Sequence, residues 1–328
     1  MNTFIAPWQR QLAEAFSNID DLCRHLAIDP SKLPVLSQFK DFPLRVPRGF
    51  ADCMEKGNPE DPLLKQVLPL QQELQEYPGF DLDPVGDLNA VTEAGVIHKY
   101  HGRVLLITTG GCAVHCRYCF RRHFPYGELQ LSNQKIDQAL AYIQLHTDIS
   151  EVILSGGDPL LLNDDKLESL LQRLGMISHI RRIRIHSRIP VVLPARITDR
   201  LLETFAKHPQ ILTLVLHANH RNELSIEVGQ ACERLKAHRV TLLNQSVLLK
   251  GINDDSNTLI QLSEKLFTFG VLPYYLHCLD RAVGVGHFEV AEHEAKRLIR
   301  TLQENLPGYL VPKLVREQSG AAYKIRIG

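Results

Sequence analysis

The 328-residue sequence has no long hydrophobic run and no excess of charge of either sign. No apolar stretch approaches the about 20 residues that a membrane-spanning helix needs. Lysine plus arginine and aspartate plus glutamate both number 37, so no net field attracts nucleic acid or an anionic membrane surface. The first residues, Met1-Asn-Thr-Phe-Ile-Ala-Pro-Trp8, lack the basic and apolar segments of a signal peptide. We therefore expect a cytoplasmic protein with no nucleic-acid and no membrane partner.

The chain also has few cysteines, and their arrangement excludes a disulfide framework. There are seven, an odd number, in a chain long enough to bury a core without covalent cross-links. Cys23, Cys53, Cys232 and Cys278 stand singly, and we predict that they are small buried hydrophobic residues. A second CxxC knuckle, which zinc modules usually have, is absent from the sequence.

The remaining cysteines lie together in Cys112-Ala-Val-His-Cys116-Arg-Tyr-Cys119-Phe120, after the apolar run Val104–Ile107 and a Gly-Gly pair. Three thiols on one loop can hold an iron–sulfur cubane and leave one iron without a protein ligand. An open coordination position is where metal chemistry takes place. The alternative is a structural zinc ion bound by the three cysteines and His115 or His123. The spacing favours the cluster.

The hydrophobic pattern predicts an α/β fold built from six successive βα units, which would form a partial (βα)6 TIM-like barrel. Eight units close such a barrel, so six would leave a gap in the wall for a large substrate. The strands are expected at 104–108, 151–154, 182–186, 211–217, 240–248 and 271–277. The helices are expected at 133–146, 164–174, 198–207, 222–238, 256–269 and 290–306, with Asn133, Thr198 and Ser256 as N-caps.

The hydrophobic pattern and composition of the first 94 residues differ from those of the rest of the chain. Apolar residues at helical spacing predict one amphipathic helix over 8–27, ended by Asp29-Pro30. The stretch 33–89 is rich in proline and aspartate, with short helical fragments such as 62–76 and no long strand. We therefore predict a helical N-terminal extension at 1–94 packed on a barrel domain at 95–328.

Polar residues gather where each predicted strand ends. The first four strands are followed, in turn, by the cysteine loop, Ser155–Pro159, His186–Arg188 and His217–His220. Asn244–Ser246 lies within the fifth strand, and His277–Asp280 ends the sixth. In barrel enzymes the catalytic groups come from the carboxyl ends of the strands. The pattern predicts one composite site at that end of the barrel.

The Cx3CxxC spacing with an aromatic residue before the last cysteine resembles the radical S-adenosylmethionine enzymes. The longer string CAVHCRYCFRRHF resembles their lysine 2,3-aminomutase branch, and the resemblance runs through nearly the whole chain from Leu44–Phe50 and Met54–Pro59 onward. It implies a radical SAM barrel, an isomerase, and three cofactors: a 4Fe–4S cluster, S-adenosylmethionine and pyridoxal 5′-phosphate. The cluster ligands it implies are Cys112, Cys116 and Cys119.

The resemblance also implies how the other two cofactors are held. Gly156, Gly157 and Asp158 match the segment that contacts the amino end of S-adenosylmethionine, and His217 and Gln245 are expected near its adenosine part. The run Tyr309–Lys324 matches the segment whose lysine binds pyridoxal phosphate, which makes Lys324 the catalytic lysine. Lys99 and Arg103 match positions that hold the cofactor phosphate. From the residues alone, Gly-Gly-Asp-Pro is a tight turn, His217 a core histidine, and Lys324 a solvated charge near the end of the chain.

The substrate implied by the resemblance is L-lysine. Arg121 matches the arginine that binds the substrate carboxylate, while Asp280 and Glu317 match acidic positions that face its ε-ammonium group. Charge complementarity favours lysine there over an acidic amino acid. The family reaction moves the amino group of lysine from C2 to C3 after an external one-electron donor has reduced the cluster.

The chain is short for this family and contains the strings CFRRHFPY and NQSVLLKGIND. In these features it resembles the bacterial EpmB (YjeK) branch of the family. That branch makes (R)-β-lysine, which a separate lysyl-tRNA-synthetase-like ligase attaches to elongation factor P. The alternative within the family is a stand-alone aminomutase of lysine breakdown or β-lysine accumulation. A zinc-stabilised barrel without catalytic activity is the alternative from a different class. Assembly as a homodimer is compatible with the resemblance.

Overall fold

A computed structural model describes residues 6–36, 42–92, 95–129 and 132–328, and places their strands in one sheet. Neighbouring strands along the chain are neighbours in the sheet, from β1 to β9. Strands β2 to β8 run parallel, while β1 and β9 pair antiparallel at the two edges. The strands are β1 Val96–Tyr100, β2 Arg103–Thr109, β3 Glu151–Gly156, β4 Arg182–Ser187, β5 Ile211–Leu216, β6 Thr241–Val247, β7 Leu272–His277, β8 Lys313–Arg316 and β9 Ile325–Arg326.

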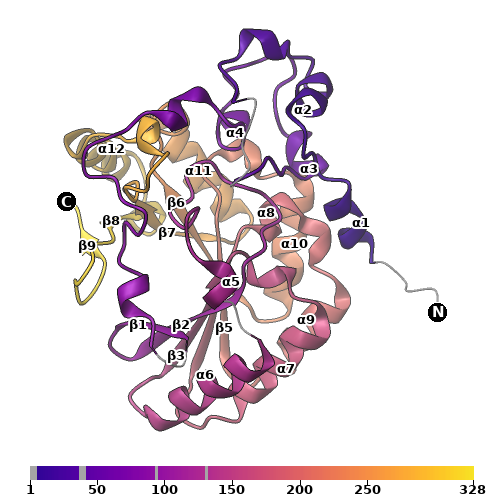
Figure 1. The fold of residues 1–328 in the computed structure, drawn as a ribbon, viewed down its shortest axis with the longest axis vertical. Helices are drawn as coiled ribbons and strands as arrows, with labels where there is room; N and C mark the ends of the chain where they lie inside the picture. Colours follow the sequence, from indigo (N-terminus) through magenta and orange to yellow (C-terminus); the bar gives the residue numbers. More distant parts are fainter. Residues whose placement is uncertain (1–5, 37–41, 93–94, 130–131) are drawn as a thin grey trace.

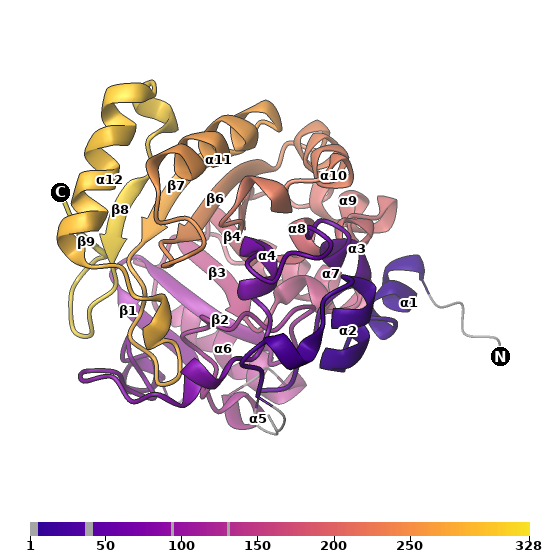
Figure 2. The same cartoon turned by 90° about the horizontal axis from the view of Figure 1, so that it is seen from above.

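Helices connect the parallel strands and cover one side of the curved sheet (Figure 1). Seen from above, α10, α11 and α12 lie along the outer side of strands β6 to β8 (Figure 2). The α-helices are α1 Pro7–Ala13, α2 Ile19–His25, α3 Arg48–Ala51, α4 Pro62–Lys65, α5 Tyr126–Leu129, α6 Asn133–Leu145, α7 Asp164–Gly175, α8 Ile189–Val192, α9 Asp199–Ala206, α10 Ile226–Ala237, α11 Ser256–Thr268 and α12 Glu292–Asn305. No helix in the described ranges is long and apolar enough to cross a membrane.

The predicted fold class and its six βα units are confirmed. β2 to β7 are the six expected strands, and α6, α7, α9, α10, α11 and α12 are the six expected helices. Thr198 caps α9 as predicted, because its hydroxyl accepts from the Leu201 amide at 3.2 Å. The other two predicted caps were each one residue too late, since Ser132 caps α6 and Asp255 caps α11. β8 is an additional parallel strand, and it carries the C-terminal segment into the sheet.

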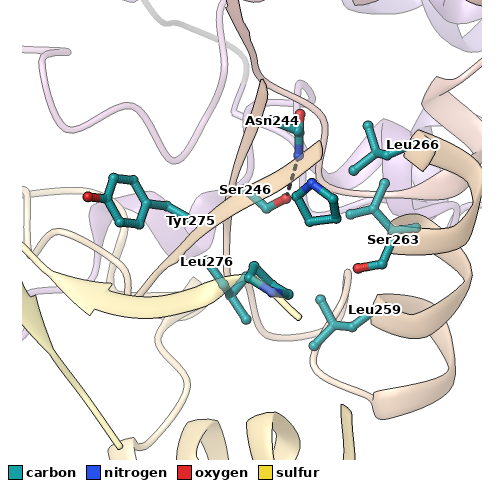
Figure 3. Close-up of a pocket in the computed structure, with 10 residues that line it drawn as sticks. Asn244, Ser246, Leu259, Ser263, Leu266, Tyr275 and Leu276 are labelled. Carbon is teal, nitrogen blue, oxygen red and sulfur yellow. Dashed lines mark hydrogen bonds between the residues drawn. The ribbon is translucent and has the colours of Figure 1, made fainter. Parts of the chain in front are cut away.

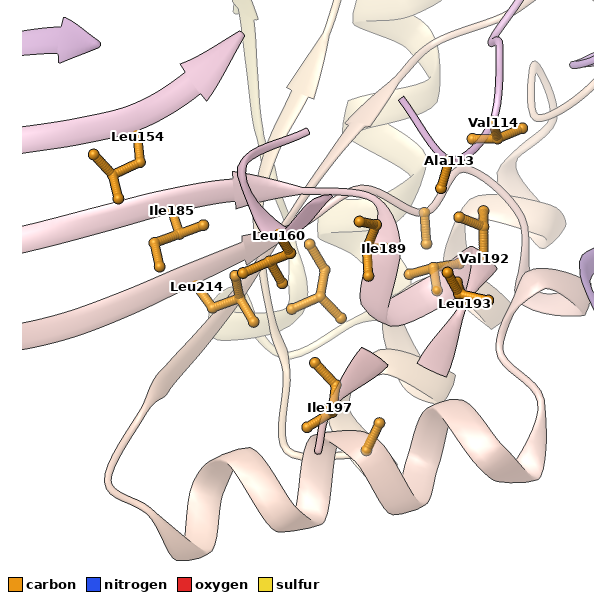
Figure 4. Close-up of a cluster of buried hydrophobic side chains, with 14 of the residues drawn as sticks. Ala113, Val114, Leu154, Leu160, Ile185, Ile189, Val192, Leu193, Ile197 and Leu214 are labelled. Carbon is orange, nitrogen blue, oxygen red and sulfur yellow. The ribbon is translucent and has the colours of Figure 1, made fainter. Parts of the chain in front are cut away.

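The core explains why these segments form parallel strands. Apolar residues on both faces of β3 and β5 are buried, as expected for strands covered on both sides, whereas β4 buries Ile183 and Ile185 on one face only. Figure 4 shows Leu154, Ile185 and Leu214 from these strands beside Leu160 and Ile189. Ala113 and Val114 of the cysteine loop belong to the same buried cluster, so the loop is packed against the barrel.

The prediction of one helix over 8–27 was wrong. The structure has two short helices, α1 and α2, interrupted at Phe16. Phe16 forms an isolated antiparallel bridge with Val46, with backbone hydrogen bonds of 2.8 and 3.0 Å in the two directions. These bonds and the burial of Phe16 outweigh the local helical pattern. Similarly, the expected helix over 62–76 is only α4 and a 3₁₀ turn, η2 (Gln71–Leu74).

The N-terminal extension packs on the barrel through a shared core. Trp8, Leu22, Phe50 and Leu64 belong to the same buried cluster as the barrel strands. Residues 1–5, 37–41 and 93–94 of the expected extension lie outside the described residues. The boundary at 94/95 stays a prediction.

Candidate active site

The cysteine loop leaves the carboxyl end of β2 and is held by backbone bonds from the N-terminal extension. The amide of His115 donates to Arg45 O at 3.1 Å, and that of Arg117 donates to Gln66 O at 2.8 Å. The amide of Cys119 donates to Cys116 O at 3.0 Å, which turns the chain so that both cysteines stay on one short loop. The extension therefore shapes the loop that carries the three thiols.

Cys112, Cys116 and Cys119 are free and half-buried thiols that influence one another. Burial raises the pKa of Cys112, and the neighbouring Cys119 and Cys116 raise it further. Burial and Cys116 raise the pKa of Cys119 to about 11. Two clustered thiols that resist deprotonation, beside a third, fit a cationic metal centre, because bound metal stabilises the thiolates.

Neither histidine of the zinc alternative is turned towards the thiols. His115 Nδ1 is bonded to Pro43 O at 2.7 Å, and its ring stacks on Phe42. His123 Nε2 is bonded to Val283 O at 3.2 Å. Within the described ranges, no three His, Cys, Asp or Glu side chains are placed to hold one metal ion. The donor set fits a multinuclear cluster better than a Cys3His zinc site.

The other four cysteines behave as predicted with one exception. Cys23, Cys232 and Cys278 are buried. Cys53 is only half-buried, and its thiol donates to Gly49 O at 3.4 Å.

Gly156 and Gly157 let two backbones approach each other beside the cysteine loop. A Cβ on Gly157 would lie 2.1 Å from Gly111 O, and one on Gly156 would lie 2.5 Å from Thr109 O. Gly156 also has φ +120°, a conformation that L side chains rarely adopt. The glycines thus fix the distance between the end of β3 and the start of the cysteine loop.

Asp158 is buried, and both of its carboxylate oxygens accept hydrogen bonds from protein donors. These are Ser187 Oγ at 2.7 Å, the amides of Arg188 at 2.8 Å and of Leu160 and Ile189 at 3.1 Å each. Burial nevertheless raises the pKa of Asp158 to about 6. Asp158 joins the ends of β3 and β4, and its expected contact with the amine of S-adenosylmethionine stays a prediction.

His217 lies against Tyr118 of the cysteine loop. The two rings stack with centroids 5.6 Å apart, and Tyr118 Oη lies 2.8 Å from His217 Nε2. Burial lowers the pKa of His217 well below its usual value, so the ring is neutral. His217 is thus both a satisfied interior histidine and a neighbour of the loop. Gln245 is half-buried on β6, opposite Tyr275 of β7.

Asp87, which the sequence did not single out, joins the predicted cofactor residue Lys99 to the predicted substrate residue Arg121. The predicted substrate residue Glu317 is connected to this pair through Lys99. Asp87 accepts from Lys99 Nζ at 2.6 Å and from Arg121 Nε and Nη2 at 2.8 and 2.7 Å. Lys99 Nζ also lies 3.0 Å from Glu317 Oε1. The Nε–Nη2 edge of the Arg121 guanidinium is therefore occupied by Asp87. Nη1 lies at the other end of the group and donates to Ser155 Oγ at 3.1 Å.

Lys324 is brought to this cluster by the pairing of the last two strands. β8 and β9 pair antiparallel with Arg316 opposite Ile325, which places Glu317 and Lys324 next to each other. Lys324 Nζ forms an ion pair with Glu317 Oε2. The Lys324 side chain is only 21% exposed, so it is not the solvated charge that its place in the sequence would suggest.

Asp280 and Glu317 lie in the wall of a cavity of about 520 Å³ between the extension and the barrel. The extension contributes residues 79–89, and the barrel contributes the segments after β7 and β8. Lys324 and Lys99 lower the pKa of Glu317 against the effect of its burial. Burial, and then the charge of Glu317, raise the pKa of Asp280 to about 7.

Three buried polar atoms near Lys324 have no hydrogen-bond partner within the described parts of the chain: Asp280 Oδ1, His186 Nε2 and His277 Nε2. Burial keeps both histidines neutral, lowering the pKa of His277 to about 3. Buried polar groups normally have partners, so these atoms mark a place that a polar ligand would complete. The residues present therefore fit a polar cofactor and a charged substrate.

Arg103 lies apart from this ion-pair network. Its guanidinium stacks over the Tyr100 ring, 4.6 Å from the centroid, and forms no ion pair with the described residues.

A second cavity, between β6, β7 and α11, is about 10 Å³ and lined mostly by apolar side chains (Figure 3). It is at most large enough for one water molecule, so it is not a substrate site.

The comparisons with known proteins define the class first. Residues 106–262, which include the cysteine loop and the strands β3 to β6, match the model of the radical SAM superfamily. Among solved structures, a radical SAM methyltransferase from Sphaerobacter thermophilus has a TM-score of 0.48 at 15% identity, over 67% of this chain and 68% of that one. The match to the family model shows that the chain carries a radical SAM domain.

The chain belongs to the L-lysine 2,3-aminomutase family, whose members are isomerases. It is 50% identical to the L-lysine 2,3-aminomutase of Escherichia coli K12, over 97% of this chain and 93% of that protein. The relative from Buchnera aphidicola is 42% identical, over 98% and 95%. That from Clostridium subterminale is 33% identical, over 97% and 76%. Membership implies a 4Fe–4S cluster, S-adenosylmethionine and pyridoxal phosphate.

Proposed function

We propose that the protein converts L-α-lysine to (R)-β-lysine, with the cluster on Cys112, Cys116 and Cys119 and pyridoxal phosphate on Lys324. One observation carries the proposal. Glu317, which forms an ion pair with Lys324, lines a 520 Å³ cavity together with Asp280, at the end of the barrel that carries the cysteine loop. When bound, the cluster and S-adenosylmethionine supply a carbon radical, and pyridoxal phosphate supplies the π system that stabilises the rearranging substrate.

The chain's own residues would bind and orient the substrate. Asp280 and Glu317 offer two carboxylates to the ε-ammonium group, and their charge disfavours an acidic substrate. Arg121 would hold the substrate carboxylate through its Nη1 end, while Asp87 fixes the guanidinium from the other edge. Arg121 is itself buried, which would keep water away from the carboxylate that it holds.

Contacts to pyridoxal phosphate would come from the first strands of the sheet and from the C-terminal segment. Lys99 and Arg103 supply the two cations for the phosphate, and Arg103 forms no ion pair with the described residues that would compete. For Lys324 to react with an aldehyde, its ammonium group must lose a proton and its ion pair with Glu317 must open. S-adenosylmethionine would be surrounded by residues at the ends of β3, β5 and β6, namely Gly156, Gly157, Asp158, His217 and Gln245.

The product would serve elongation factor P in the cytoplasm, through a separate lysyl-tRNA-synthetase-like ligase. The resemblance of CFRRHFPY and NQSVLLKGIND supports this branch. Loss of β-lysyl-modified elongation factor P in a deletion strain would separate this role from a stand-alone aminomutase of lysine metabolism.

The activity is tested by anaerobic incubation with L-lysine, S-adenosylmethionine, pyridoxal phosphate and dithionite, with the product identified by mass and chromatography. We expect β-lysine from the wild-type chain. Cys116→Ala should lose the cluster absorbance and the product together, because two thiols cannot hold the cluster. Full turnover by that variant would contradict the cluster assignment, and zinc without iron or sulfide in anaerobically purified protein would favour the non-catalytic alternative.

A further inference from the structure

A buried arginine lies against one of the three cysteine sulfurs. Arg188 follows β4, and its Nη1 donates to Cys116 Sγ at 2.7 Å and to Tyr118 Oη at 2.6 Å. The residue is 7% exposed, and its guanidinium also lies over the Tyr118 ring, 5.6 Å from the centroid. A guanidinium group cannot lose its proton in a protein, so a permanent positive charge stands beside this sulfur.

The other side of the same guanidinium is fixed by residues from distant parts of the chain. Arg188 Nη2 donates to Gln66 Oε1 at 2.7 Å and to Glu223 Oε2 at 2.9 Å. Glu223 is fully buried, and its second oxygen accepts from Gln66 Nε2 at 3.0 Å and from the Asn219 amide at 2.9 Å. The charge of Arg188 is thus oriented with Nη1 towards the sulfur, while the compensating carboxylate lies on the far side.

We propose, on the basis of the cluster assignment above, that Arg188 raises the reduction potential of the cluster through Cys116, and that Glu223 limits this effect. Reduction adds one electron, taken from a one-electron reductant, to the oxidised cluster, and no proton or bond is transferred. The reduced cluster carries one more negative charge than the oxidised one. A cation and a hydrogen-bond donor at a ligand sulfur therefore stabilise the reduced form. The low-dielectric surroundings increase the effect, because little water screens these charges.

The two residues should shift the potential in opposite directions. Arg188→Gln removes the cation and should move the midpoint potential of the cluster to a more negative value. Glu223→Gln removes the compensating anion and should move it to a more positive value. Arg188→Lys keeps a charge at the position and should stay nearer to the wild-type value than Arg188→Gln does. A residue that only supports the fold would give no such pair of opposite signs.

The measurement is a redox titration of the anaerobically reconstituted protein, followed by electron paramagnetic resonance of the reduced cluster. It is performed without S-adenosylmethionine, so a contact between Arg188 and that cofactor cannot produce the shift. The iron content of each variant is measured first, which tests the cluster assignment separately from the effect of Arg188. Arg196→Gln is the matched control. Arg196 is also buried after β4, but its Nε donates to Leu160 O, and no hydrogen bond joins it to a described sulfur.

Opposite shifts in Arg188→Gln and Glu223→Gln, with little change in Arg196→Gln, would support the assignment. Unchanged potentials in iron-loaded variants, or shifts of the same sign in both, would overturn it. A loss of S-adenosylmethionine binding with an unchanged potential would overturn it as well. If Arg188→Gln does not take up iron, the sign of the shift in Glu223→Gln decides, since a negative or absent shift there is incompatible with a charge effect.

Discussion

At the scale of single residues, two of the carboxyl groups in the wall of the cavity, those of Asp280 and Glu317, differ in their ionisation. Glu317 has two lysine partners, which lower its pKa and keep it charged. Asp280 is buried, has an unpartnered oxygen and lies near Glu317, so its pKa is raised to about 7. Without substrate, one carboxylate is permanently charged and the other is protonated over part of the physiological pH range.

This difference predicts a pH dependence of lysine binding. An ammonium group binds the ionised form of Asp280, and that form increases as the pH rises through about 7. We therefore expect the affinity for L-lysine to be about tenfold higher at pH 8 than at pH 6, with a proton released on binding at pH 6. The measurement is the KM or Kd for lysine at both pH values. Asp280→Asn is the control, and it should bind lysine more weakly with little dependence on pH. Equal wild-type affinity at both values would rule out a role for Asp280 ionisation.

At the scale of elements, the sequence predicts the strands much better than the surroundings of the site. The parallel strands appear as short, largely apolar runs rich in β-branched residues or leucine, so β2 to β7 could be located from the sequence. The Cx3CxxC spacing likewise located the cysteines, whereas Lys324 came only from the resemblance of residues 309–324 to the family segment. Asp87 and Glu73 could not be found in this way, because each acts through contacts between segments far apart in the chain. Arg188 was noted only as part of a polar cluster after a strand, and its contact with Cys116 could not be predicted from the sequence. Phe16 shows the same limit, since a bridge to Val46 interrupts a helical pattern.

One prediction concerns the contact between the end of β3 and the start of the cysteine loop. A methyl group in Gly157→Ala would lie 2.1 Å from Gly111 O, so the backbone must separate there. We expect a loss of stability of about 1 to 3 kcal/mol, typical of overpacking, together with a lower iron content. Gly308→Ala is the control, because nothing lies within 4 Å of its added methyl group. Denaturant unfolding and iron analysis of both variants test this, and an unchanged Gly157→Ala would show that the close approach is dispensable.

At the scale of the whole molecule, the N-terminal extension forms part of the active site. It supplies Asp87 and one wall of the 520 Å³ cavity, and its backbone binds the cysteine loop at His115 and Arg117. The edges of the barrel are not joined by backbone pairing between β1 and β9. They are linked instead by the ion pair of Lys99, on β1, with Glu317, after β8. The site thus lies where the open barrel, its first and last strands and the extension meet.

Glu73 links the extension to the cysteine loop through two arginines. This buried carboxylate accepts from Arg117 Nε and Nη2 at 2.8 and 2.6 Å and from Arg122 Nη2 at 2.7 Å. Both guanidinium groups belong to the segment around the three thiols, and each is at most 3% exposed. The extension therefore provides the negative charge that balances two buried cations beside the cluster loop.

Removing that charge should weaken the fold and the loop together. Glu73→Gln keeps the shape of the side chain but takes the carboxylate from two buried guanidinium groups. We expect the free energy of unfolding to fall by about 3 to 5 kcal/mol, because two desolvated guanidinium groups lose this charged partner. Cluster uptake should fall as well, since the same arginines position the loop. Glu60→Gln, which removes an exposed ion pair with Lys65, serves as the control and should leave both quantities unchanged. Denaturant unfolding and iron analysis measure the two effects. If Glu73→Gln were as stable and as rich in iron as Glu60→Gln, the extension would cover the barrel without organising its metal-binding loop.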